Sequence, residues 1–416
     1  MARSRVSSPI SLVSEVFDQP KSPATRPCDS DSDLSDLGDG DEFAYEYEGE
    51  PPHCIIRILP TKDQWADFPA ILAFARRIGA EADGCFKLIL PDELRHDAPV
   101  KPARTLTSNG YKVTQIRKNR FWRVSTIPCE GVFNEADDGE GFTGSTTEAM
   151  NKLKTLFRKS SGRKFRNTRY RPDVPAWTAQ QRHLAGVPET SPIHPLKGDL
   201  LDQTKVIVPG IHTPYVYESA AHFGAMFQIH AEDYRLLSLN HLYKGRKIWI
   251  VTPCTTISAV EAALGRGDSA CSQFMRHRAE FIFPEKLTQL GIDHRVVDQR
   301  PGETMVILPD AYHEGFSTGY TLAEAKNYAD DGWDKALYAP CEEACSWATA
   351  IPAGHMAFLE AGEERIDLRA AYELERKEYL DGEQLKRPLE GDDDNAEEQG
   401  SPEKRARVEA DGVDVE

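Results

Sequence analysis

The sequence lacks any long apolar run. No stretch of about 18 apolar residues occurs among its 416 residues, so no transmembrane helix is expected. The opening residues, MARSRVSSPISLVSEVFDQP, also lack the apolar core of a secretory signal peptide. The eight cysteines are too few and too scattered for a disulfide framework in a chain of this length. We therefore expect an intracellular protein, without a membrane partner, whose thiols are reduced, buried or bound to metal.

Apolar residues are scarce at both ends of the chain. Residues 28–50 and 390–416 are acidic and rich in Gly, Ser and Pro. Such segments cannot bury enough surface to offset their ordering entropy, so both tails are predicted to be disordered. They hold much of the formal net charge of −17, and the body is closer to neutral, so this charge does not exclude nucleic acid. The sequence KRAR at 404–407 is either a short nuclear-import signal or a solvated patch.

Between the tails, the pattern changes several times, and no internal repeat occurs. Pro60 and Thr61 mark a helix start between two short apolar strands. Breaks at Pro and Gly divide 206–329 into short strands, which favours a barrel or sandwich. The predicted domains are a disordered tail over 1–52, an α/β element over 53–97, a linker with a helical and basic segment over 98–175, a β barrel over 176–347, a charged helix over 348–388 and a second disordered tail over 389–416.

Seven cations fall between Arg158 and Arg171, with Phe165 and Tyr170 interleaved. Such a density predicts weak contact with a DNA phosphate backbone. A solvated helix end and loop would show the same composition, and both interpretations stay open.

The stretch FQIHAEDYRLLSLNHLYKGRKIWIV holds a possible metal site. His230 and Glu232 stand two apart, so in a strand both side chains leave the same face. His313 follows on a distant strand. Two histidines and one carboxylate form a facial triad that leaves open positions, as in non-haem Fe(II) oxygenases. Lys247 provides a cation for the far carboxylate of a 2-oxo acid, Asn240 a further donor and Phe227 a pocket wall, although each also fits an ordinary core or strand-end role.

A second metal site is indicated by cysteines and a histidine. Cys271 and His277 lie in CSQFMRH, and Cys341 and Cys345 lie in CEEAC. Three thiolates and one imidazole suit tetrahedral zinc, although free core thiols are the alternative.

The segments FQIHAEDYRLLSLNHLYKGRKIW and AYHEGFSTGYTLAEAKNYA closely resemble the JmjC domain of 2-oxoglutarate-dependent histone lysine demethylases. The segment 56–94 is similar to the JmjN element that packs on such domains. The resemblance implies a mainly β protein with flanking helices, in which a double-stranded β-helix (a jelly-roll, cupin-like barrel) carries the JmjN element. It also implies zinc at the four residues of the second site, and it covers about 54–347.

The resemblance assigns roles residue by residue. His230, Glu232 and His313 would bind iron, while Asn240, Lys247 and Phe227 would bind 2-oxoglutarate. The residues expected to line the methyl-lysine channel are Gly210, Tyr217 and Asn327. The implied reaction is hydroxylation of an N-methyl group on a histone lysine, followed by release of formaldehyde. The expected substrate is the tail of histone H3, and the expected location is the nucleus.

Three positions depart from the family's pattern. Leu201 is aligned with a tyrosine whose hydroxyl binds 2-oxoglutarate, and one lost hydrogen bond to a charged group costs roughly 1.5–3 kcal/mol. Ala325 replaces a hydroxyl-bearing residue, and Lys326 beside it is expected to point away from the pocket. These changes keep two alternatives open, namely a non-enzymatic chromatin protein and a protein hydroxylase of the same fold.

Overall fold

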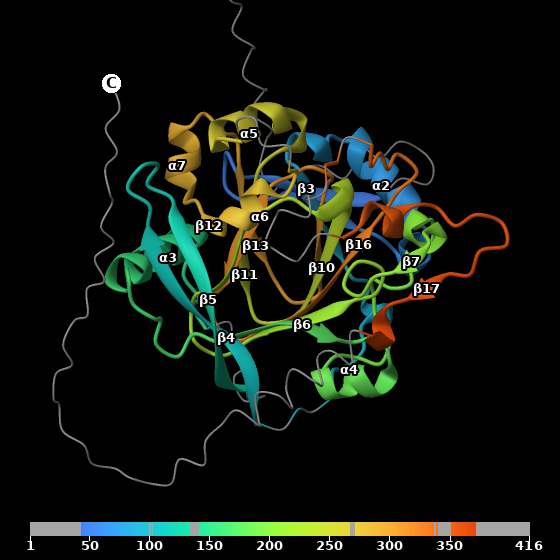
Figure 1. Ribbon diagram of the computed structural model, residues 1–416, viewed down its shortest axis with the longest axis horizontal. Coiled ribbons are helices and arrows are strands. Elements are labelled where there is room, and N and C mark those ends of the chain that lie inside the picture. Colours follow the sequence, from blue (N-terminus) through green and yellow to red (C-terminus); the bar gives the residue numbers. More distant parts are fainter. Residues whose placement is uncertain are drawn as a thin grey trace, which may run out of the picture. The chain divides into compact units, whose positions relative to one another are not determined.

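Two β-sheets form the centre of the part of the chain that the structure describes. The computed structural model describes residues 43–99, 101, 103–133, 141–266, 271–336, 338–339 and 351–371. Every helix and strand named below belongs to one unit, residues 1–369, and of the second unit, 370–416, only 370 and 371 are described. Figure 1 shows the sheets at the centre with helices around them. None of the helices in these ranges is long and apolar enough to cross a membrane.

The larger sheet has eleven strands, and most neighbouring pairs in it are antiparallel. In spatial order they are β1 (Ala44–Glu48), β2 (Ile55–Leu59), β3 (Cys85–Ile89), β14 (Glu303–Ile307), β10 (Leu237–Lys244), β16 (Thr321–Tyr328), β8 (Tyr215–Ser219), β6 (Tyr170–Pro175), β4 (Arg104–Gln115), β5 (Trp122–Phe133) and β12 (Glu280–Phe281). The smaller sheet has four strands, β13 (Arg295–Gln299), β11 (Lys247–Val251), β15 (His313–Ser317) and β9 (Ala225–His230). The expected mainly β, jelly-roll-like barrel with flanking helices is therefore confirmed.

Helices of the described residues lie around the sheets. They are α1 (Lys62–Trp65), α2 (Phe68–Arg77), α3 (Thr146–Lys159), α4 (Ala179–Ala185), α5 (Ile257–Leu264), α6 (Phe274–Arg278) and α7 (Pro284–Gln289). Thr61 caps α1, as the sequence predicts, and Ser145 forms a capping box with Glu148 at the start of α3. The segment 53–97 forms β2, α1, α2 and β3, and β3 joins it to the barrel through β14. Its identity as a JmjN element stays a prediction.

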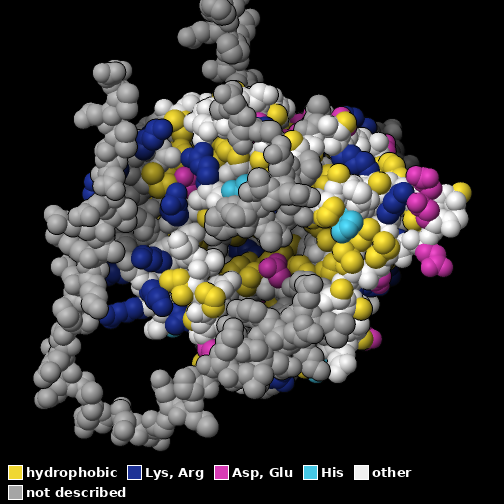
Figure 2. Space-filling view, in the orientation of Figure 1, with side chains coloured by type: hydrophobic (Ala, Val, Ile, Leu, Met, Phe, Trp, Pro, Cys, Tyr) yellow, Lys and Arg dark blue, Asp and Glu magenta, His cyan; other side chains and the backbone are white. Residues whose placement is uncertain are grey.

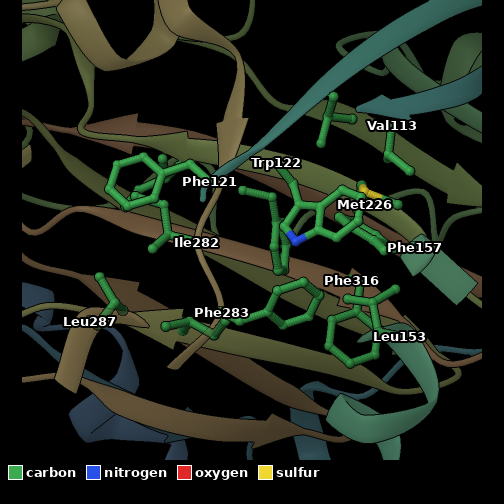
Figure 3. Close-up of a cluster of buried hydrophobic side chains, with 14 of the residues drawn as sticks. Val113, Phe121, Trp122, Leu153, Phe157, Met226, Ile282, Phe283, Leu287 and Phe316 are labelled. Carbon is green, nitrogen blue, oxygen red and sulfur yellow. The ribbon is translucent and has the colours of Figure 1, made fainter. Parts of the chain in front are cut away.

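The largest hydrophobic cluster joins the β4–β5 hairpin and α3 to the smaller sheet. Figure 3 shows Trp122 among the side chains of this cluster, and its ring lies 5.3 Å from that of Phe157 on α3. Met226 of β9 and Phe316 of β15 belong to the same cluster. These contacts hold β9 and β15 from outside, and the site residues lie on the same two strands.

Two predicted boundaries are wrong. Residues 44–48 were expected in the disordered tail, but they form β1, in which Tyr45 packs against Phe74 at 5.6 Å. Part of 348–388 was expected to be helical, but 366–367 form the strand β17 (Ile366–Asp367), parallel to β7 (Val206–Ile207). Arg365 fixes this strand by donating to two backbone carbonyls in 201–204. Tertiary hydrogen bonds thus override the helix propensity of the segment.

Candidate active site

The three predicted iron ligands lie together at one end of the smaller sheet. His230 ends β9, Glu232 follows two residues later, and His313 begins β15, directly opposite His230. One ligand atom from each residue lies within 4.8 Å of the others. The Glu232 Oε1 atom is 3.4 Å from the His313 Nε2 atom. The structure therefore brings the sequence-predicted triad into ligand geometry.

Both histidines present the Nε2 atom to the common centre. The Nδ1 atom of His230 lies 2.7 Å from the Gln228 carbonyl, and that of His313 lies 3.1 Å from the Ala311 carbonyl. A backbone carbonyl at Nδ1 fixes the tautomer in which Nε2 is free to ligate a metal. This arrangement follows from the strand backbone and was not visible in the spacing.

Charges around the triad favour the ligating protonation states. Burial, and then the nearby His313 and Arg276, lower the pKa of His230 to about 3, so its imidazole is neutral. Burial alone would raise the pKa of Glu232, but its contact with His313 and the positive charge of Arg276 hold it well below its usual range. Arg276 of α6 contributes from 3.9 Å, and it also pairs with Asp233 at 2.8 Å. Sequence reasoning missed Arg276, because nothing in its spacing connects it with residues 230–232.

The wall next to the triad is aromatic. The ring of Phe227 lies 4.9 Å from that of Trp249 and 6.3 Å from that of His313. Gly315 is paired with Phe227 across the β9–β15 ladder, and a Cβ atom there would meet the Phe227 ring at 2.7 Å. Close packing of the ring therefore depends on a missing side chain. Trp249 lies two residues after Lys247, so the alternation of side chains in KIWIV could have predicted that both lie on the same face of the strand.

Lys247 is a buried cation. Its residue is 2% exposed, and burial lowers the pKa of its ammonium group to about 7. Within the described ranges its charged group has one recorded contact, with the ring of Trp249 at 5.9 Å, and it pairs with no acid. A buried charge without a partner is costly, so this group is suited to an incoming anion.

Asn240 offers an unsatisfied amide. Its Oδ1 atom is buried and has no hydrogen-bond partner among the described residues. Gln299 fixes the backbone beneath it by donating to the Asn240 carbonyl at 2.7 Å, and it accepts from Trp249 Nε1 at 2.8 Å. Rotating the amide by half a turn presents Nδ2, a donor, at the same place.

The predicted channel residues lie on neighbouring segments. Gly210 packs closely against the ring of Tyr215, and the backbone N–H of Asn327 donates to the carbonyl of Ile211 at 3.2 Å. Tyr217 lies two residues after Tyr215 on β8, and its pKa is raised by burial and then by acidic groups that include Glu232. The ring of Tyr217 stacks on that of Tyr170, with a centroid separation of 6.4 Å and an angle of 23°. Tyr170 was expected in a basic loop, and the structure places it at this wall.

Two of the departing positions can be placed against the pocket. Lys326 ion-pairs with the buried Asp199 at 2.6 Å, opposite Leu239 rather than Asn240, so it points away as expected. Ala325 is the residue paired with Asn240 across β10 and β16.

The third departing position, Leu201, is buried in the 3-10 turn 200–203. It packs in a separate cluster with residues such as Leu236 and Met356. Its apolar side chain therefore cannot replace the hydroxyl group of the tyrosine that the family resemblance aligns with this position.

Half of the predicted zinc site is described. The Cys271 Sγ atom lies 3.4 Å from His277 Nε2. Cys341 and Cys345 lie outside the described residues. The structure places the Cys271 thiol beside the His277 imidazole, and the four-residue zinc set stays a prediction.

Comparison with known proteins agrees with the geometry. Residues 219–328 match the family model described as "JmjC domain, hydroxylase". The chain is 28% identical over 308 residues to the probable lysine-specific demethylase 4F of Homo sapiens, covering 68% of this chain and 45% of that protein. It is 28% identical to the lysine-specific demethylase 4D of Rattus norvegicus, covering 68% and 56% of the two chains. For the lysine-specific demethylase 4B of Mus musculus, the identity is 26%, with 69% and 27% covered.

The chain spans about half or less of the length of these curated relatives. The matched JmjC segment contains all three triad residues together with Asn240 and Lys247. Residues 219–328 therefore form a JmjC-type domain, and the proteins similar to this chain include lysine-specific demethylases.

Proposed function

We propose that this protein is an Fe(II)- and 2-oxoglutarate-dependent dioxygenase that removes N-methyl groups from histone lysine in the nucleus. The observation that carries the proposal is the triad of His230, Glu232 and His313, with both Nδ1 atoms held by backbone carbonyls, together with the buried and unpaired Lys247. A facial triad and a buried cation are what a metal ion and a chelating 2-oxo acid require.

The donor set fits a ferrous ion. Two imidazoles and one carboxylate occupy one face, which leaves the other positions for small ligands. A ferrous ion held there would supply the activation of O2 that is coupled to decarboxylation of the 2-oxo acid. The protein's part is to hold the ligand atoms in place, which the carbonyls of Gln228 and Ala311 do through the histidine Nδ1 atoms.

The cosubstrate's far carboxylate would bind at Lys247 and Asn240. Lys247 supplies a point charge in a low-dielectric site, where one ionic contact is stronger than in water. Asn240 supplies a hydrogen bond, and Phe227 covers the carbon chain. These residues bind and orient the cosubstrate, and the burial of the site keeps water away from it.

The methylated ammonium of the substrate would lie against the stacked rings of Tyr217 and Tyr170. Aromatic faces attract quaternary and methylated cations, and the negative charge of Glu232 acts in the same direction. In the net reaction, 2-oxoglutarate loses CO2 and becomes succinate, which takes one oxygen atom of O2, and the other oxygen atom enters the N-methyl C–H bond. The resulting hemiaminal breaks its C–N bond to give formaldehyde and the amine, so the atoms balance.

The test combines turnover with cosubstrate binding. Methylated histone peptides incubated with Fe(II), 2-oxoglutarate and O2 should lose methyl groups and release formaldehyde. His230→Ala should abolish both, whereas His222→Ala, which changes an exposed histidine, should leave them unchanged. In anaerobic protein, 2-oxoglutarate should add a metal-to-ligand absorption band that Lys247→Ala removes. No methyl loss from any methylated histone peptide would overturn the demethylase assignment.

Ala325 supports the two alternative functions. It places a methyl group opposite Asn240, where a hydroxyl was expected from the family resemblance. A hydroxylase would yield a product heavier by one oxygen atom instead of a lost methyl group. A chromatin scaffold without enzymatic activity would show no absorption band with 2-oxoglutarate, and its cellular role would survive His230→Ala.

We also propose structural zinc at Cys271, His277, Cys341 and Cys345. The contact of the Cys271 sulfur with the His277 ring supports this set, and tetrahedral zinc accepts these ligands. Elemental analysis should find zinc bound to purified protein, and Cys271→Ser should reduce it. A full complement of zinc in that variant would exclude Cys271 as a ligand.

A further inference from the structure

One outer face of the protein carries many cations and few acids. We call it the basic face and define it by nine exposed residues, Lys112, Arg117, Lys118, Arg120, Arg158, Lys159, Arg163, Lys164 and Arg166. They come from the β4–β5 hairpin, the end of α3 and the loop that follows α3. The sequence contains no Asp or Glu in 104–129 or 149–172. Figure 2 shows Lys and Arg side chains gathered on the side where Figure 1 places α3, β4 and β5.

The backbone under these cations is held in place. The loop after α3 is tied to β4, because the Gly162 N–H donates to Val113 O at 2.8 Å and the Phe165 N–H donates to Tyr111 O at 2.7 Å. At the hairpin tip, the Asn119 side chain accepts from the Phe121 N–H at 3.0 Å. The cations are therefore presented by a fixed surface, which lowers the entropy lost when a partner binds.

The basic face is electrostatically unfavourable in the isolated chain. Lys112 and Lys164 stand directly opposite each other across an isolated antiparallel bridge, where like charges destabilise. No ion pair with an acid is recorded for any of the nine cations within the described residues. The C-terminal end of the α3 dipole accounts for Arg158 and Lys159, but not for the other seven. A partner with many negative charges would relieve this repulsion.

The aromatic residues of this region indicate which polyanion fits. Tyr111, Phe121, Trp122 and Phe165 are all buried, with at most 7% exposure. Recognition of single-stranded nucleic acid relies on bases stacked on exposed rings, and these rings do not offer that. Contact with the phosphates of a duplex needs only placed cations. The two aromatic residues interleaved with the cations do not offer such rings either, because Phe165 lies in the core and Tyr170 stacks on Tyr217.

We propose that the basic face binds the phosphate backbone of duplex DNA without reading the base sequence. The site is wider than the basic segment seen in the sequence, because the structure adds Lys112 and the hairpin tip, residues 117–120. Binding needs neither iron nor 2-oxoglutarate, so it can be tested whether or not the proposed catalytic activity is correct.

The experiment measures fluorescence anisotropy of a labelled duplex DNA with the full chain over a range of salt concentrations. The logarithm of affinity should fall linearly with the logarithm of salt concentration. In Lys164→Glu, the new acid faces Lys112, so thermal stability should hold or rise while DNA affinity falls several-fold and the salt slope decreases by about 1. The doubly substituted variant Arg117→Glu with Lys118→Glu should also weaken binding. The matched control Lys62→Glu makes the same charge change on the exposed start of α1 and should have little effect.

Comparisons among nucleic acids, a competing polyanion and the control variant either support or overturn the proposal. Equal affinity for duplex DNA and duplex RNA supports recognition of the backbone, and preference for either duplex over a single strand also supports it. Tighter binding to single strands, competition by poly-glutamate at equal charge, or the same loss in Lys62→Glu as in Lys164→Glu would overturn it.

Discussion

At the residue scale, the buried charge of Lys247 favours binding of an anionic cosubstrate but destabilises the folded protein. Its ammonium group is buried without an acidic partner, and its pKa of about 7 is well below the ordinary 10.5. Replacing it by Met keeps the volume and removes the charge, so we expect Lys247→Met to raise the free energy of unfolding by about 1–4 kcal/mol near neutral pH. The same change should abolish 2-oxoglutarate binding. Urea denaturation measures the stability, and calorimetry measures the binding of 2-oxoglutarate. A variant less stable than the unchanged protein would contradict the inference that Lys247 is a buried charge without a partner.

The same pKa predicts how cosubstrate binding depends on pH. A carboxylate binds the protonated ammonium, and the free protein loses that proton as the pH rises through about 7. The affinity for 2-oxoglutarate should therefore be constant below pH 6 and fall by up to tenfold for each pH unit above about 7. Calorimetry in buffers of different ionisation enthalpy should also show proton uptake on binding near pH 8. Affinity that does not change between pH 6 and 9 would mean that Lys247 stays charged without the ligand.

Residues of the triad could be predicted from the sequence, because chemistry restricts them to few residue types. β9 ends at His230, but Glu232 follows in extended backbone, so the period of two still places both side chains on one face. Arg276 and Tyr170 could not be predicted, because each reaches the site through contacts between segments far apart in the chain. The same limit affected Leu201, which is buried in a core cluster that the sequence pattern did not reveal.

At the element scale, the pairing of β9 with β15 depends on Gly315. A Cβ atom there would lie 2.6 Å from the Ile248 carbonyl oxygen and 2.7 Å from the Phe227 ring. The carbonyl belongs to the β11 ladder and cannot move far, so in Gly315→Ala the ring of Phe227 should be displaced. We expect a loss of stability of about 1–3 kcal/mol, as for other overpacked core positions, and weaker 2-oxoglutarate binding.

The matched control for this substitution is Gly354→Ala. Gly354 has open space around its Cα, so the added methyl group should change neither property by much. Thermal unfolding and calorimetry of the two variants provide the comparison. Equal stability of both would show that β15 shifts freely against β11.

Elements with a strong local signal were predicted well, and elements held by distant contacts were not. The helix from Thr146 has an amphipathic pattern and a capping box, and α3 occupies that range. In contrast, β1 lies in an acidic sequence, and its acids are neutralised by β2 and β3 through Arg57 and Lys87. Likewise, β17 forms where Arg365 reaches the backbone of 201–204. Arg57 and Lys87 lie outside the acidic segment, and 201–204 is far from Arg365 in the sequence, so composition alone predicted a tail and a helix.

At the scale of the whole molecule, residues 1–369 bury histidines that stay neutral away from the triad. Burial, followed by nearby positive charges, lowers the pKa of His241 to about 3 and that of His212 to about 3. In the unfolded chain a histidine has a pKa near 6.5. Between pH 6.5 and 3 the unfolded chain therefore binds protons that the folded chain does not, and stability falls as the pH decreases.

His241 allows this acid sensitivity to be tested. It is 1% exposed, its Nδ1 atom lies 2.9 Å from Thr304 Oγ1, and Arg95 is the positive charge that faces it. In His241→Gln an amide replaces the titrating ring, so the variant should lose some stability at pH 7 because of imperfect packing. Its further loss between pH 7 and 4.5 should be smaller than that of the unchanged protein by about 2–3 kcal/mol.

The control His222→Gln changes an exposed histidine and should reproduce the pH dependence of the unchanged protein. Urea denaturation at several pH values measures the difference directly. If His241→Gln loses stability with acid as steeply as the control does, the acid-sensitive groups are the buried carboxylates.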